Sequence, residues 1–146
     1  MKTIQRSIEI QAAHHNIYNI VADIEQYPIF LPWCESSEII QNHSNTVIAK
    51  LSLNLFGFRT SITTENQMQK PENIKMTLKS GPFRKFNASW LFEPKSASTT
   101  QVTYTMNYQL INPLVEKIIE KNIDLFIDQL MRSFTNQYNQ EITNQD

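Results

Sequence analysis

The C-terminal stretch from Leu114 to Asp146 contains neither glycine nor proline, and this uninterrupted run constrains the fold more than any other feature. Asn112 and Pro113 precede it, and these residue types are favoured at the N-cap and at the first position of a helix. We therefore predict one long helix that begins at Pro113. With about 28 helical residues and a rise of about 1.5 Å per residue, it would span about 42 Å.

The apolar face of this helix is two rows of side chains wide. One row of residues spaced four apart is interrupted by Asn122, and a second row runs beside it. Such a face is broader than the seam of a two-stranded coiled coil, so the helix needs a wide apolar partner. Asn122 either meets the polar headgroup of a ligand or faces solvent at the helix edge. The first row is Ile118, Phe126, Leu130, Phe134 and Tyr138, and the second is Val115, Ile119, Ile123, Ile127 and Met131.

Most of the preceding chain alternates apolar and polar residues with a period of two, which is typical of half-buried strands. In residues 3–11 three isoleucines share one side of the expected strand, and Arg6 interrupts that side. Six further strands are expected, separated by short turns rich in asparagine, glycine or proline. They comprise residues 37–41, 46–55, 58–68, 74–79, 84–92 and 100–110, and a polar loop at 94–98 joins the last two.

The apolar spacing changes to that of an amphipathic helix over residues 12–24. A second, shorter helix should follow, because Pro28 suits a first helical turn and Pro32 ends a helix. Strands joined by hairpin-length connections pair antiparallel, and only the C-terminal helix is long enough to cover their apolar face. We predict an α+β fold of the helix-grip type, with two short helices after the first strand. In it a curved antiparallel sheet of about seven strands wraps round the C-terminal helix, and residues 1–146 form a single domain.

The segment from Tyr27 to Cys34 concentrates apolar side chains in a short irregular stretch. Its sequence is Tyr-Pro-Ile-Phe-Leu-Pro-Trp-Cys, in which five of the eight residues are large and apolar. A surface segment of this kind either plugs one end of the sheet or forms the lid of a cavity. The residues alone do not decide between a plug and a lid.

A sheet curved round a helix need not close along its whole length, and an open stretch would leave a hollow. An apolar void costs stability because contacts are lost on every wall, so a protein that keeps one usually binds a ligand in it. The same large side chains could equally form an ordinary core. The candidate wall residues are Phe30, Trp33, Phe56, Phe83, Phe86, Trp90, Phe126, Leu130, Met131 and Phe134.

Catalytic and metal-binding motifs are not evident in the sequence. Cys34 is the only cysteine, which excludes an intrachain disulfide and zinc sites built from two or more cysteines. It lies between Trp33 and Glu35, and a reactive thiol needs a nearby base or positive charge, so a packing role fits it better. We therefore expect no enzyme activity, no metal site and no cofactor.

The charge and hydropathy patterns restrict the partners. The net charge is -1, whereas binding through phosphates usually selects a strongly basic face, so we expect no DNA partner. No apolar run approaches the ~20 residues of a membrane-spanning helix, and the N-terminus does not resemble a signal peptide. We expect a cytoplasmic protein, whose membrane contact would be peripheral and at the inner face of the membrane.

Three segments resemble one protein family along nearly the whole chain. The segment from Tyr27 to Cys34 resembles the Y-P-x-F-L-P-W-C signature of the coenzyme Q-binding proteins, members of the START-like, polyketide cyclase/dehydrase superfamily. Residues 81–94 resemble the G-P-F segment of these proteins that continues into W-x-F-x-P. Phe126, Met131 and Phe134 are similar to their F-x₄-M-x₂-F ending.

This resemblance implies a START-like lipid-binding domain. Its first implied function is the binding of ubiquinone, or a related isoprenoid lipid, in support of respiratory electron transport, and the Pro-Trp-Cys triplet favours it. The alternative is that of the RatA-type toxins, which bind the large ribosomal subunit and block subunit association. A cyclase or hydrolase of the same superfamily would need convergent polar groups in the cavity, and the sequence offers no recognisable set. The implied cavity and gate residues are Tyr27, Phe30, Leu31, Pro32, Trp33, Phe83, Phe86, Trp90, Phe126, Leu130, Met131 and Phe134.

Overall fold

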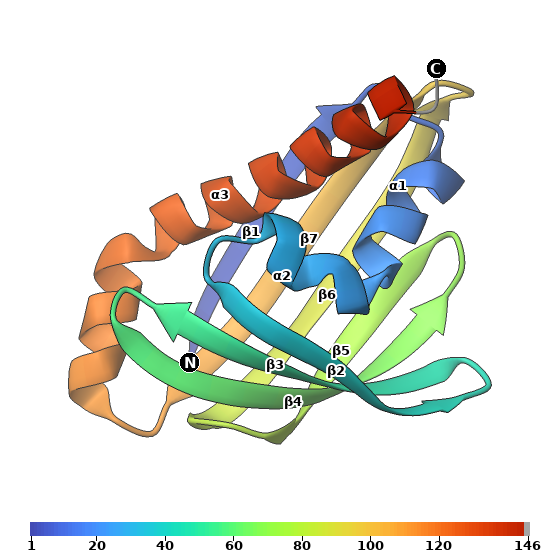
Figure 1. The fold of residues 1–146 in the computed structure, drawn as a ribbon. Helices are drawn as coiled ribbons and strands as arrows, with labels where there is room; N and C mark the ends of the chain where they lie inside the picture. Colours follow the sequence, from blue (N-terminus) through green and yellow to red (C-terminus); the bar gives the residue numbers. More distant parts are fainter. Residues whose placement is uncertain (145–146) are drawn as a thin grey trace.

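The computed structural model describes residues 1–144, which form one seven-stranded antiparallel sheet, one long helix and a group of short helices (Figure 1). The strand order is β1-β7-β6-β5-β4-β3-β2, so β2 to β7 form a meander and β1 pairs with β7. The elements are β1 (Lys2–Ile10), α1 (His14–Ala22), the 3₁₀ helix η1 (Ile24–Gln26), α2 (Tyr27–Phe30), β2 (Cys34–His43), β3 (Thr46–Leu55), β4 (Phe58–Gln69), β5 (Asn73–Ser80), β6 (Phe83–Ser96), β7 (Thr99–Leu110) and α3 (Pro113–Asn144).

The sheet curves strongly, and α3 runs across its concave side (Figure 1). The short helices α1 and α2 lie on the same side as α3. Helix α3 begins at Pro113, and the side-chain oxygen of Asn112 accepts a hydrogen bond from the Leu114 N–H at 2.9 Å. The predicted helix-grip architecture and the predicted N-cap are therefore confirmed.

The boundaries of several elements differ from the sequence-based prediction, and α3 has 32 residues rather than about 28. Residues 94–98 were expected to form a polar loop, but β6 continues to Ser96 and Pro94 pairs with Thr100. The ladder between β5 and β6 ends at Leu91, so no neighbouring strand requires the N–H that proline lacks. A register shift after Pro94 then ends the strand. Strand β2 starts at Cys34 rather than at residue 37.

The core lies between the concave face of the sheet and α3. Along β7 burial alternates residue by residue, and every second side chain from Thr100 to Leu110 is buried. From α3, the most deeply buried side chains are those of Ile127 and Phe134. Alternating residues of a strand point to opposite faces, so this pattern directs one face of β7 towards the helix.

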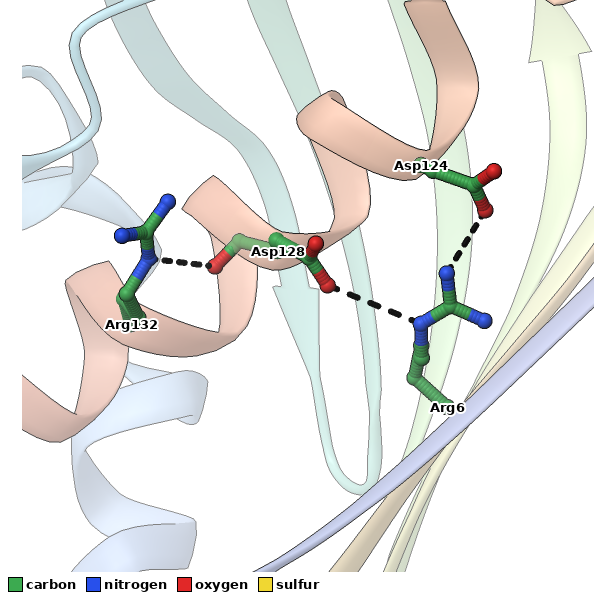
Figure 2. Close-up of polar contacts among 4 residues, drawn as sticks. All are labelled: Arg6, Asp124, Asp128 and Arg132. Carbon is green, nitrogen blue, oxygen red and sulfur yellow. Dashed lines mark hydrogen bonds and ion pairs between the residues drawn. The ribbon is translucent and has the colours of Figure 1, made fainter.

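Arg6, which interrupts the apolar side of β1, is held by α3 (Figure 2). Its Nη2 atom lies 2.6 Å from Asp124 Oδ1, and its Nε atom lies 3.6 Å from Asp128 Oδ1. Arg132 Nε donates a hydrogen bond to the main-chain oxygen of Asp128 at 3.4 Å. The Arg6 guanidinium therefore links β1 to α3. Lys2 forms a parallel contact with Glu120, 3.1 Å away.

Candidate functional site

A cavity of about 100 Å³ lies between the sheet and the N-terminal half of α3. Its floor comes from β3 to β7, and its roof comes from three apolar residues of the helix. Trp33 closes one side, and its ring lies 4.7 Å from that of Phe126. The lining residues are Trp33, Leu51, Leu53, Leu55, Phe56, Ile62, Thr64, Met76, Phe83, Phe86, Tyr104, Met106, Tyr108, Ile119, Ile123 and Phe126.

Four of the site residues expected from the sequence resemblance line this cavity. They are Trp33, Phe83, Phe86 and Phe126. The rings of Phe83 and Phe86 lie 5.0 Å apart at the start of β6. Phe56, a candidate wall residue, also lines the cavity. The chain thus brings together residues from β6, α3 and the loop after α2.

The other expected site residues lie beside the cavity rather than around it. Tyr27 and Trp90 line a second, smaller cavity of about 20 Å³. Pro32 borders a groove on the outer surface, together with Trp33 and Phe126. A role of these residues in ligand binding stays a prediction. The remaining five pack into the core or against it, and they are Phe30, Leu31, Leu130, Met131 and Phe134.

An aromatic cluster explains why these neighbouring residues form solid core. The ring of Phe134 lies 5.4 Å from Tyr27, 5.3 Å from Phe30 and 5.2 Å from Trp90. All three contacts have the edge-to-face geometry that aromatic pairs favour. The Tyr27 hydroxyl donates a hydrogen bond to the main-chain oxygen of Val21. The cluster therefore packs the C-terminal half of α3 against α2 and β6.

Sequence reasoning missed most of the cavity floor. Leu51, Leu53 and Leu55 were recognised as one face of a strand but not as cavity wall. The signal that could have found them is the alternation of β3 and β7, whose inward faces meet the N-terminal half of α3. The other missed residues are Ile62, Thr64, Met76, Tyr104, Met106, Tyr108, Ile119 and Ile123.

The mouth of the cavity is bordered by the turn between β3 and β4. Phe56 and Gly57 form this two-residue turn, because Leu55 pairs with Phe58. Both turn residues have positive φ, 55° and 90°. Asparagine followed by glycine is the usual choice for such a turn, whereas a phenylalanine with positive φ is strained. The Phe56 side chain is nevertheless 41% exposed beside the outer groove.

The indole N–H of Trp33 is buried and has no hydrogen-bond partner among residues 1–144. An unpaired buried donor costs stability, so its presence needs an explanation. Trp33 lines both the cavity and the outer groove, so this donor belongs to a residue shared by the two spaces.

The ionisable groups near the cavity are held in their neutral forms. Burial raises the pKa of the Tyr104 hydroxyl well above its usual range. Burial likewise raises the pKa of the Cys34 thiol to about 11, although a hydrogen bond with the Ser36 backbone acts in the opposite direction. Cys34 therefore stays a thiol at neutral pH. Within residues 1–144, no cluster of three or more His, Cys, Asp or Glu side chains could hold a metal ion.

A curved antiparallel sheet that grips a long helix around an apolar cavity defines a class of helix-grip ligand-binding domains. The family model for polyketide cyclase / dehydrase and lipid transport proteins matches residues 10–135, and the chain belongs to this family. No helix of the described residues is long and apolar enough to cross a membrane.

Curated relatives and solved structures agree with this family. The chain is 27% identical over 135 residues to the persistence and stress-resistance toxin PasT of Escherichia coli O6:H1, covering 92% of this chain and 85% of the relative. The same identity and coverage hold for the ribosome association toxin RatA of Escherichia coli K12. The ZhuI aromatase/cyclase of Streptomyces superposes with a TM-score of 0.88 at 13% identity, over 97% of this chain and 95% of that one. This last similarity concerns the fold alone.

We predict that Phe56→Asn stabilises the protein, raising the free energy of unfolding by about 1 kcal/mol, because asparagine tolerates positive φ. Urea unfolding followed by circular dichroism measures the change. Gly57→Ala is the matched control and should destabilise, since its backbone has φ of 90° although no atom lies within 4 Å of the added methyl group. A destabilised Phe56→Asn variant would show that the ring contributes more through packing than it costs in strain.

Proposed function

We propose that the protein binds ubiquinone, or a related isoprenoid lipid, without transforming it, and so supports respiratory electron transport. The observation that carries this proposal is the apolar cavity between the sheet and the N-terminal half of α3, which adjoins an open groove. Burying apolar ligand surface contributes about 25 cal/mol per Å². A chain of isoprene units offers much such surface and few groups that need hydrogen bonds.

For a ligand of this kind to bind, the mouth of the cavity has to open. Pockets for drug-sized ligands usually measure about 300–1,000 Å³, whereas this cavity holds about 100 Å³. Four residues line both the cavity and the outer groove, namely Trp33, Leu55, Phe56 and Phe126. Among them, the rings of Trp33 and Phe126 lie 4.7 Å apart. Rotation of these two rings would join cavity and groove into one longer channel. The tail of the ligand would then occupy the groove.

The chemistry of the wall supports binding rather than catalysis. The sixteen lining residues include no aspartate, glutamate, histidine, lysine, arginine or cysteine. General acid–base catalysis needs a group whose pKa lies near the operating pH. The buried hydroxyl of Tyr104, whose pKa burial raises, does not meet this requirement. The proposal therefore assigns the cavity to storage or delivery of a lipid.

Filling the cavity should weaken binding. We predict that Leu53→Trp weakens the binding of decylubiquinone at least tenfold, because the larger ring occupies space that the ligand needs. Isothermal titration calorimetry measures the dissociation constant. The matched control is Leu91→Trp, which adds the same ring at a 41% exposed position of β6 outside the cavity. Equal affinities of the two variants for decylubiquinone would contradict binding in this cavity.

A second candidate function is association with the large ribosomal subunit. The names of the curated relatives favour it, because RatA of Escherichia coli K12 is called a ribosome association toxin. The charge distribution gives it less support, since binding to ribosomal RNA needs a basic surface. Several basic side chains are paired with carboxylates, including Arg59 with Glu35 at 3.5 Å and Lys79 with Glu65 at 4.0 Å.

Sedimentation separates the two candidates. If the lipid-binding proposal is correct, the protein should stay at the top of a sucrose gradient when mixed with purified large ribosomal subunits, because its net charge is -1. Co-sedimentation that weakens steeply between 50 and 200 mM salt would instead support the ribosomal function, as expected for contacts with phosphates. If the ribosomal function is correct, the Leu53→Trp variant should co-sediment as the wild type does, because a surface contact with the ribosome should not depend on the cavity.

A further inference from the structure

Two buried polar side chains interrupt the apolar concave face of the sheet. Thr64 and Asn66 are 4% and 3% exposed, and both lie on the inward face of β4. Thr64 lines the main cavity and the smaller cavity, and Asn66 lines the smaller one. The third buried polar residue of the core, Thr100, is satisfied because its hydroxyl donates to the main-chain oxygen of Ala12 at 2.7 Å.

The Asn66 side chain has hydrogen-bonding capacity to spare. Thr64 Oγ1 donates a hydrogen bond to Asn66 Oδ1 across 2.7 Å. This bond occupies the carbonyl oxygen and leaves the two N–H groups of Nδ2 for a further acceptor. Burying an amide in apolar surroundings costs stability unless its polar atoms are paired. An aliphatic side chain would fill the same position at lower cost, so packing alone does not explain the pair.

The pair lies where the two cavities adjoin, far from the mouth. Leu51, Thr64 and Met76 line both cavities, which are therefore neighbours across these three side chains. Asn66 is eight residues along β4 from Phe58, where the strand leaves the mouth turn. At about 3.3 Å per residue this is about 26 Å of strand. Thr64 and Asn66 therefore place side-chain hydrogen-bonding groups at the end of the hollow away from the mouth turn.

The tyrosines add to the polarity of this deep end. Tyr27 lines the smaller cavity and Tyr104 the main one. Burial, and to a lesser extent the neighbouring Tyr104, raise the pKa of Tyr27. The Tyr27 hydroxyl is already used, since it donates to the Val21 main-chain oxygen. Asn66 Nδ2 therefore offers two donors at this end of the hollow.

We propose that Thr64 and Asn66 form a headgroup subsite, and that an amphiphilic ligand enters with its headgroup first. Asn66 Nδ2 donates a hydrogen bond to a carbonyl or ether oxygen of the headgroup, and the apolar tail extends towards Phe56 and Phe126. This subsite rests on the proposed function and narrows its ligand class. The residues that line the two cavities include no lysine, arginine or histidine, so the headgroup is an uncharged acceptor rather than a carboxylate or phosphate.

A pair of ligands with the same tail tests the subsite. Decylubiquinone carries the acceptor oxygens, and decylbenzene has the same ten-carbon tail without them. In calorimetric titrations Asn66→Leu should weaken decylubiquinone binding about tenfold, the equivalent of about 1.4 kcal/mol and of one lost hydrogen bond, and should leave decylbenzene binding unchanged or tighter. Asn87→Leu, the same substitution at an exposed position of β6, should change neither affinity.

The outcomes separate the subsite from the proposed function. A wild-type protein that binds decylubiquinone, with Asn66→Leu binding it equally well, would overturn the subsite alone. A wild-type protein that binds neither ligand would overturn both proposals. The double variant Thr64→Val with Asn66→Leu supplies a second readout, since a buried polar pair kept for a ligand can be replaced by apolar groups at no loss of stability. A urea midpoint equal to or above that of the wild type supports the subsite, and a clear decrease would show that the pair is structural.

Discussion

The contact between Phe134 and the aromatic residues beneath it fixes the position of α3, and the cavity depends on that position. Phe134 packs edge-to-face on Tyr27, Phe30 and Trp90, all within 5.4 Å. These contacts hold the C-terminal half of the helix on α2 and β6. Beneath its N-terminal half a cavity of about 100 Å³ remains between the helix and the sheet. The C-terminal half of α3 thus forms part of the core, and its N-terminal half covers the cavity.

The cavity combines a strained entrance with a polar far end. Phe56 keeps an exposed aromatic ring in a backbone conformation that suits asparagine, and Asn66 keeps an amide in apolar surroundings. Each of these two residues lowers stability relative to a residue type that suits its position better. Costs of this kind are expected at functional sites, where local preference and global fold disagree. Their positions at opposite ends of one hollow fit a ligand with an apolar tail and a polar headgroup.

Much of the fold could be predicted from the sequence, because periodicity reports which face of an element is buried. The apolar rows of α3 and the alternation of β7 are examples. The cavity itself could not be predicted in the same way, since Phe126 at its wall and Phe134 in solid core belong to the same row of the helix. The apolar periodicity of the sequence is the same for a side chain that packs against another and for one that faces a cavity. The ion pairs of Arg6 could not be predicted either, because its partners Asp124 and Asp128 lie 118 and 122 residues away in the sequence.

The central claim is that this cavity holds an isoprenoid lipid, and the lipid that accompanies the protein from its native host tests it most directly. The full chain would be purified without detergent, extracted with organic solvent and analysed by mass spectrometry, with Leu53→Trp treated in parallel. The account predicts an isoprenoid quinone in extracts of the wild-type protein and its loss from the Leu53→Trp variant. Wild-type extracts that are repeatedly free of isoprenoid lipid, or equal amounts in both proteins, would contradict it.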